Sequence, residues 1–239
     1  MPRTARQDRH QSLEELGLVS ASVIHEVRNA LQGIHSALFL LERDPTLRQK
    51  AREWIAGAQR ELARAFEASR QTLSLVREDP PAQVSVTAVL DEVLAACSDK
   101  TADRGITIER SYGFTGHIEA NEGAVREVFT NLILNAVEAA PRQSGRLEIH
   151  TSPATRTNGS EVSGVQIRIS DNGPGIPEKD QKKVFEPLFS TKKGKGTGLG
   201  LWVSHRLVRQ QHGVLRLASS TSGANAGSSF SVFLPLKQN

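Results

Sequence analysis

The sequence is short of several features, and each shortage excludes a class of protein. Only one cysteine, Cys97, stands among the 239 residues, so an intrachain disulfide is excluded and a reducing compartment is expected. No apolar run reaches the roughly 18 residues of a membrane span, and no signal peptide precedes the first helical pattern. We therefore expect a cytoplasmic chain with no membrane segment.

The chain also has no strong excess of positive or negative charge. The 30 Lys and Arg residues and the 26 Asp and Glu residues are spread along the chain, and no basic run is interleaved with aromatic residues. This diffuse net charge of +4 predicts no nucleic-acid partner. The chain also lacks the G-x-x-x-x-G-K-[ST] spacing of a P-loop, and no G-x-G-x-x-G opens a βαβ unit.

The length suits two modest domains, and the first begins with a long heptad pattern. After a flexible lead-in over residues 1–10, apolar or small residues recur in steps of three and four, at Leu13, Leu16, Ser20, Val23, Val27, Ala30, Ile34, Ala37 and Leu41. This predicts a helix over residues 11–43. Asp44-Pro45-Thr46 breaks it, and a second stripe predicts an antiparallel helix up to residue 78. Two helices enclose little core, so we expect a homodimer that forms a four-helix bundle. A monomeric hairpin packed on the rest of the chain is the alternative.

His25 falls on the outer face of the first predicted helix, at the heptad position farthest from the core. A lone histidine is more often a satisfied core residue, but this register places it in water. Glu26 is adjacent and could hold the tautomer of the ring, while Asn29 lies one helical turn on. A neutral imidazole on an exposed face is a workable nucleophile at neutral pH, so His25, Glu26 and Asn29 are candidate catalytic residues. A merely solvated histidine is the alternative.

Beyond a hinge at Asp79-Pro80-Pro81, the pattern changes to mixed α and β, which predicts a linker over 79–83 and a second domain over 84–239. Helices are predicted at 87–104, 122–140 and 198–211, and strands at 106–110, 147–151, 165–169, 214–217 and 229–234. Asn121 is the expected N-cap of the middle helix. Strands that cluster late with helices between them predict a two-layer α/β sandwich.

Three stretches of this domain carry candidate ligand-binding residues. Asn131 and Asn135 share one helix face, and an amide oxygen is a good ligand for Mg²⁺; surface asparagines are the alternative. Asp171 follows a strand, and Gly173 and Gly175 would let the backbone pass close to a planar ligand, although an Asn-Gly turn explains them equally well. The stretch Ser190–Leu201 is rich in glycine and lysine and enters a helix, which suits phosphate; a flexible solvated loop is the alternative.

In this order and spacing, the three stretches resemble the N, G1 and G2 boxes of the GHKL (Bergerat) ATP-binding fold, with Val184–Phe189 similar to the F box between them. His25–Leu31 resembles the H box of sensor histidine kinases of the HisKA dimerisation type, except that Ala30 stands where the family has proline. Together, five motifs in order cover residues 11 to 236. The resemblance implies a catalytic core that uses ATP and Mg²⁺ and passes a phosphoryl group from His25 to an aspartate of a response regulator.

The resemblance also assigns roles to matching residues. Asn135 would be the main Mg²⁺ ligand, with Asn131 on the phosphate side, and Asp171 would bind the adenine amine beside Gly173 and Gly175. The phosphates and the mobile lid would involve Lys192, Gly196, Thr197, Gly198, Leu199 and Gly200. Two rivals stay open: a GHKL ATPase that only hydrolyses ATP, and a dimeric phosphorelay or scaffold protein with a degenerate nucleotide domain.

Overall fold

The computed structural model describes residues 80–157, 161–187, 189–191, 198–223 and 226–237, together with isolated residues between 31 and 65. The chain divides into two compact units, of which the second comprises Glu78–Thr191 and Gly198–Asn239. The described residues of the first unit are all helical, but most of the two predicted helices lies outside them. The helical hairpin therefore stays a prediction.

The second unit is built on a mixed five-stranded sheet with the strand order β2-β4-β5-β7-β6. The strands are β2 (Thr107–Tyr112), β4 (Arg146–Thr157), β5 (Glu161–Asp171), β6 (Val214–Ser220) and β7 (Gly227–Pro235). β2 and β4 run parallel, and the other neighbouring pairs are antiparallel. A separate two-stranded sheet pairs β1 (Ala82–Ser85) with β3 (His117–Ala120).

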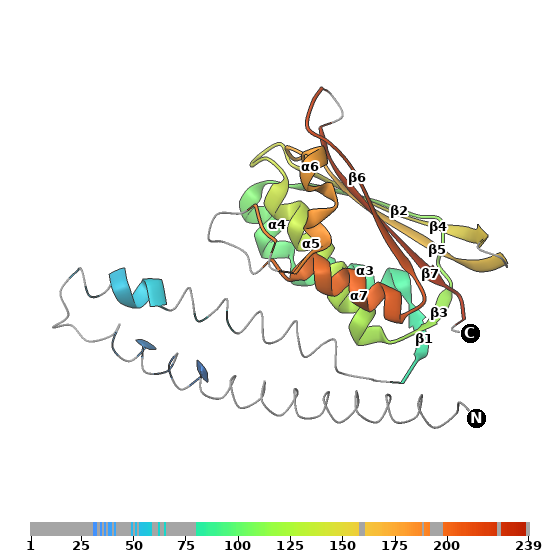
Figure 1. Ribbon diagram of the computed structural model, residues 1–239, viewed down its shortest axis with the longest axis horizontal. Helices are drawn as coiled ribbons and strands as arrows, with labels where there is room; N and C mark the ends of the chain where they lie inside the picture. Colours follow the sequence, from blue (N-terminus) through green and yellow to red (C-terminus); the bar gives the residue numbers. More distant parts are fainter. Residues whose placement is uncertain are drawn as a thin grey trace, which may run out of the picture. The chain divides into compact units, whose positions relative to one another are not determined.

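Helices gather on one face of the five-stranded sheet (Figure 1). They are α3 (Val86–Ala96), α4 (Ser98–Arg104), α5 (Glu122–Ala139), the single turn α6 (Glu178–Gln181), the 3₁₀ turn η1 (Lys183–Phe185) and α7 (Gly200–Gln210). α5 packs against α3, α7 and β5. The predicted two-layer α/β sandwich is therefore confirmed.

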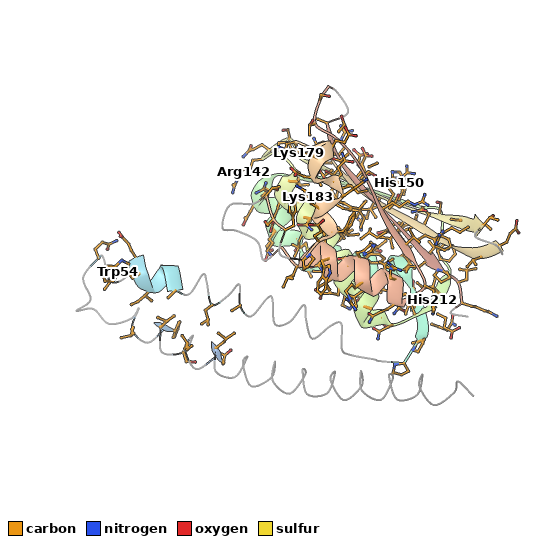
Figure 2. The ribbon with its side chains drawn as sticks, in the orientation of Figure 1. Trp54, Arg142, His150, Lys179, Lys183 and His212 are labelled. Carbon is orange, nitrogen blue, oxygen red and sulfur yellow. The ribbon has the colours of Figure 1, made fainter. Side chains whose placement is uncertain are left out.

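The core lies between the helices and the sheet because the strands alternate. On β4, Leu147 and Ile149 are fully buried, whereas His150 is exposed and lies on the sheet away from the helical layer (Figure 2). From the helical side, Phe129 and Leu132 of α5 are also fully buried. Each such side chain contributes roughly 1.5–3 kcal/mol by leaving water.

The structure departs from the predicted elements in the segment before α5, and the strands β4 and β5 are longer than predicted. The predicted helix over 87–104 is two helices, because Cys97 leaves the helical conformation (φ −96°, ψ 2°) and α4 starts afresh after it. The pair β1 and β3 was not predicted, since each strand has only four residues. β1 begins at Ala82, inside the predicted linker.

In the described part of the chain, no helix combines the length and the apolar character that crossing a membrane requires.

Candidate functional site

The site begins with α5, whose start is fixed by its cap. The predicted N-cap Asn121 is confirmed: its Oδ1 accepts a hydrogen bond from the N–H of Ala124 at 2.8 Å. The 18-residue helix then carries Asn131 and Asn135 one turn apart on the same face. Asn131 is buried, with 6% of its surface exposed, and Asn135 is half-buried. Both predicted residues are thus held by a rigid element.

Asn131 faces the start of α7. Its Nδ2 lies 3.4 Å from the carbonyl oxygen of Gly200 and 3.4 Å from Oγ of Ser204, and 3.3 Å from Oε1 of Glu127 on its own helix. Ser204 itself donates to the Gly200 carbonyl at 2.8 Å. The structure therefore brings Asn131 of the first motif to Gly200 of the third, and gives Asn131 a bridging position between the two helices.

The second motif starts at Asp171, the last residue of β5, and continues as a turn to Ile176. Oδ1 of Asp171 accepts a hydrogen bond from the N–H of Gly173 at 2.8 Å. Gly173 lies against the end of α5: a Cβ there would stand only 2.8 Å from the carbonyl oxygen of Ala139. Ala139 is four residues beyond Asn135, so the turn lies beside the helix face that carries Asn135. The structure thus places the first and second motifs next to one another.

Gly175 shapes this turn in a way that the sequence did not specify. Its φ of +71° is in the left-handed region, and a Cβ there would collide with the backbone carbonyl of Ser220 at the end of β6. Glycine is required because it tolerates both the dihedral angle and the close approach. The turn is therefore packed onto the β6–β7 hairpin.

Two serines and a glutamine at this junction were missed by the sequence analysis. In the strand register, Ser228 of β7 is opposite both Asp171 of β5 and Ser219 of β6. Oγ of Ser219 accepts from the N–H of Ile176 at 2.8 Å, and Nε2 of Gln181 donates to the Ile176 carbonyl at 3.0 Å. The only sequence signal for the two serines is the alternation of side chains along two serine-rich strand ends. Without the strand register, these strand ends look like a polar turn.

The third motif is described only at its end. Gly198 has a φ of +68°, and Gly200 opens α7. Leu199 occupies the N-cap position and its side chain has no acceptor, so it cannot cap the N–H groups of the first turn. These groups suit the phosphate role expected of this stretch. Lys192, Gly196 and Thr197 lie outside the described residues, as do His25, Glu26 and Asn29 of the first unit.

The segment that resembles the F box is held against α7. The ring of Phe185 in η1 lies 5.5 Å from the ring of His205 in α7, at a tilt of 42°. Burial, and to a smaller extent the charge of Arg209, lowers the pKa of His205. A neutral imidazole therefore packs on the phenyl ring at neutral pH.

A polar hollow of about 690 Å³ lies at the same end of the sheet. Most of its lining belongs to the face away from the helices, including Arg146, Glu148, Ser170 and Ser229. Nε of Arg146 lies 3.6 Å from Oε1 of Glu109, and its Nη1 lies 3.6 Å from Oε1 of Glu148. Asn135 does not line the hollow, but Asp171 and Asn172 of the second motif do, so the hollow adjoins the Asp171 turn.

Comparison with known proteins identifies the domain. Residues 120–238 match the family described as histidine kinase-, DNA gyrase B- and HSP90-like ATPases. These residues belong to that family. The matched span contains α5, the turn after β5 and the start of α7, so it holds all three stretches in which nucleotide-binding residues are predicted.

Relatives extend over nearly the whole chain. The signal transduction histidine-protein kinase AtoS of Escherichia coli (strain K12) is 30% identical over 97% of this chain, which spans 36% of AtoS. Sporulation kinase C of Bacillus subtilis (strain 168) is 31% identical over 99% of this chain, which spans 52% of that kinase. The chain thus spans about half or less of the length of these relatives. The predicted relationship to sensor histidine kinases is confirmed.

A solved structure shows the same fold. Full-length ShkA in complex with AMPPNP matches 92% of this chain and 46% of its own, with a TM-score of 0.70 and 23% identity. At that identity the likeness supports the fold alone.

Proposed function

We propose that the chain is the catalytic core of a two-component histidine kinase, which transfers the γ-phosphoryl group of Mg-ATP to His25 and then to an aspartate of a response regulator. The observation that carries the proposal is the extent of the match. Two relatives named as histidine kinases align with 97% and 95% of the chain, far beyond the ATPase domain at residues 120–238.

ATP would bind where the three motifs meet. The carboxylate of Asp171 can accept a hydrogen bond from the exocyclic amine of adenine. Gly173 and Gly175 beside it carry no side chains, so a ligand can approach the backbone closely. The uncapped first turn of α7, with Gly196, Gly198 and Gly200, suits the phosphates. Lys192 and its neighbours would add positive charge from the lid. ShkA, crystallised in complex with the nucleotide AMPPNP, has the same fold.

The residues present fit a magnesium ion that is shared with the phosphates. The Asn135 amide offers the oxygen that Mg²⁺ prefers, on a face next to the turn that would hold the nucleotide. Mg²⁺ in such a site usually keeps waters and phosphate oxygens as its other ligands. When bound, it would neutralise charge on the transferring phosphoryl group.

In the first unit, His25 would act as the nucleophile. Glu26 would orient its ring or accept its proton, and Asn29 would position water when the regulator is dephosphorylated. The linker before β1 would let the ATPase domain reach the histidine. Ala30 in place of the family's proline would leave the predicted helix without a proline kink, which would affect switching rather than chemistry.

A homodimer through the two N-terminal helices is part of the proposal. Large apolar side chains of the first unit are exposed in the single chain: Ile34, Phe39, Leu41 and Trp54. Trp54 alone has 72% of its surface exposed. Apolar surface of this kind would be covered by pairing with a second copy. The proposed setting is the cytoplasm, with the receiver domain of a response regulator as the second partner.

Incubation of the full chain with γ-labelled ATP and Mg²⁺ tests the proposal against its rivals. A histidine kinase forms phosphoprotein that loses its label in acid and keeps it in base. Phosphate release without labelled protein would favour a GHKL ATPase. Failure to bind ATP would favour a phosphorelay or scaffold protein.

A further inference from the structure

One hydroxyl group joins the turn after β5 to the β6–β7 hairpin. Oγ of Ser219 accepts a hydrogen bond from the N–H of Ile176 at 2.8 Å and donates one to the carbonyl of Gly227 at 2.7 Å. It also lies 3.0 Å from Oγ of Ser228. Gly227 in turn packs so tightly against the Asp171 carbonyl that a Cβ at position 227 would collide with it. Ser219 therefore links both strands of the hairpin to the Asp171 turn.

The hydrogen bonds around Ser219 fix the direction of its bond to Ser228. A serine hydroxyl has one proton and two lone pairs. The Gly227 carbonyl can only accept, so it takes the Ser219 proton, while the Ile176 N–H occupies one lone pair. Ser228 must then donate its own proton to the second lone pair of Ser219. The Ser228 oxygen is left with acceptor capacity alone.

The direction of these hydrogen bonds affects the proposed nucleotide site, because Ser228 is directly opposite Asp171 in the register of β5 and β7. Side chains opposite one another in a sheet share a face, so the Ser228 oxygen stands beside a carboxylate, which when ionised is also an acceptor. Two neighbouring hydrogen-bond acceptors, the Ser228 oxygen and the Asp171 carboxylate, favour a ligand that presents a hydrogen-bond donor, such as the exocyclic amine of adenine. It disfavours a carbonyl in that place, as in guanine, because acceptors then face one another.

We propose that Ser219 is a positioning and specificity-determining residue for the nucleobase. It holds the Asp171–Ile176 turn in place and keeps the neighbouring Ser228 hydroxyl turned so that the site favours adenine over guanine. The proposal rests on the proposed function, since it requires that this site binds ATP. It assigns Ser219 a role through its neighbours, without contact between Ser219 and the nucleotide.

The sheet supplies a matched control one residue away. Ser170 and Ser229 form a second pair of hydroxyls, 2.8 Å apart, on the neighbouring strands β5 and β7. Each directly neighbours Asp171 or Ser228 along its strand, so strand alternation places both on the opposite face of the sheet. Ser229→Ala therefore removes a half-buried hydrogen bond of the same kind, on the face of the sheet that does not carry the Asp171 and Ser228 side chains.

The experiment measures equilibrium binding of ATP and of GTP, each with Mg²⁺, to the full chain. Ser219→Ala loses the bond to Ile176 and frees the Ser228 proton, so its affinity for ATP should fall about tenfold and its preference for ATP over GTP about fivefold. Ser219→Thr keeps the hydroxyl and should restore both values. Ser229→Ala should stay within about twofold of the wild type in both, whatever its melting temperature.

A purely structural serine would behave differently, and two results would overturn the proposal. One is an unchanged ATP-to-GTP preference in Ser219→Ala, even if its melting temperature falls. The other is an equal loss of preference in Ser229→Ala. If Ser219→Ala does not fold, Ser219→Cys fills the same space with a weaker hydrogen-bonding group and should show the same loss. Wild-type protein that binds neither nucleotide would instead refute the proposed function itself.

Discussion

Replacing Gly175 by alanine should loosen the turn that carries Asp171. The residue has a φ of +71°, where an L-amino acid costs about 1–2 kcal/mol. Its new Cβ would also meet the Ser220 carbonyl, and relieving such an overlap costs about 1–3 kcal/mol more. In a domain of this size each kcal/mol lowers the melting temperature by about 2–4 °C. The total of about 2–5 kcal/mol should therefore lower the melting temperature of the ATPase domain by about 4–20 °C in Gly175→Ala.

Gly223 provides the control for backbone strain. It has nearly the same dihedral angle, a φ of +75°, but a Cβ there would meet nothing within 4 Å. Gly223→Ala should therefore show the strain alone, a loss of about 2–8 °C, with ATP binding unchanged. Thermal unfolding and nucleotide binding of both variants separate the two contributions. Equal losses of stability, or normal ATP binding by Gly175→Ala, would refute the close packing of the turn on the hairpin.

Three further predictions concern single groups. Asp171→Asn should weaken ATP binding by about tenfold to a hundredfold, because a hydrogen bond to a charged group is replaced by a neutral one; an unchanged dissociation constant would remove Asp171 from the site. Leu132→Ala should destabilise the ATPase domain by about 3–5 kcal/mol in urea unfolding, since Leu132 is fully buried in the core, and a loss below about 1 kcal/mol would contradict that packing. Burial, together with the hydrogen bond and charge of Asp91, raises the pKa of Tyr112 to about 12. Tyr112 is the single tyrosine of the chain, so a tyrosinate absorbance titration reports on it alone. The midpoint should fall in Asp91→Asn, and the stabilisation by neutral Tyr112, complete below about pH 10, should be lost as the pH rises through about 12.

Local signals were enough to predict the element that carries most of the site. The 122–140 helix was predicted to within one residue because its cap, its apolar face and its stop at Pro141 all agree. The two-layer sandwich followed from the order of strands and helices. By contrast, the break at Cys97 was missed, since the residues on both sides of it favour helix. Strands β1 and β3 are stable only as a pair that is distant in sequence, which no local pattern reveals.

The same division applies to the site. Asp171 and the glycines near it were identified from one short stretch, whereas the part played by Ser219 depends on three segments that meet only in the fold. Asn131 shows the limit from the other side. The family resemblance predicted a place beside phosphate, but the contact of Asn131 with the Gly200 carbonyl depends on how α5 and α7 pack. Long-range register and helix packing are the information that the linear pattern lacks.

The central claim is that ATP bound beside Asp171 phosphorylates His25. The most direct test incubates wild type, His25→Gln and Asp171→Asn with γ-labelled ATP and Mg²⁺, and measures acid-labile label on the protein together with nucleotide binding. The account predicts label on the wild type, none on His25→Gln although it still binds ATP, and little on Asp171→Asn because it binds ATP weakly. Full labelling of His25→Gln would contradict the account, since another residue would then accept the phosphoryl group.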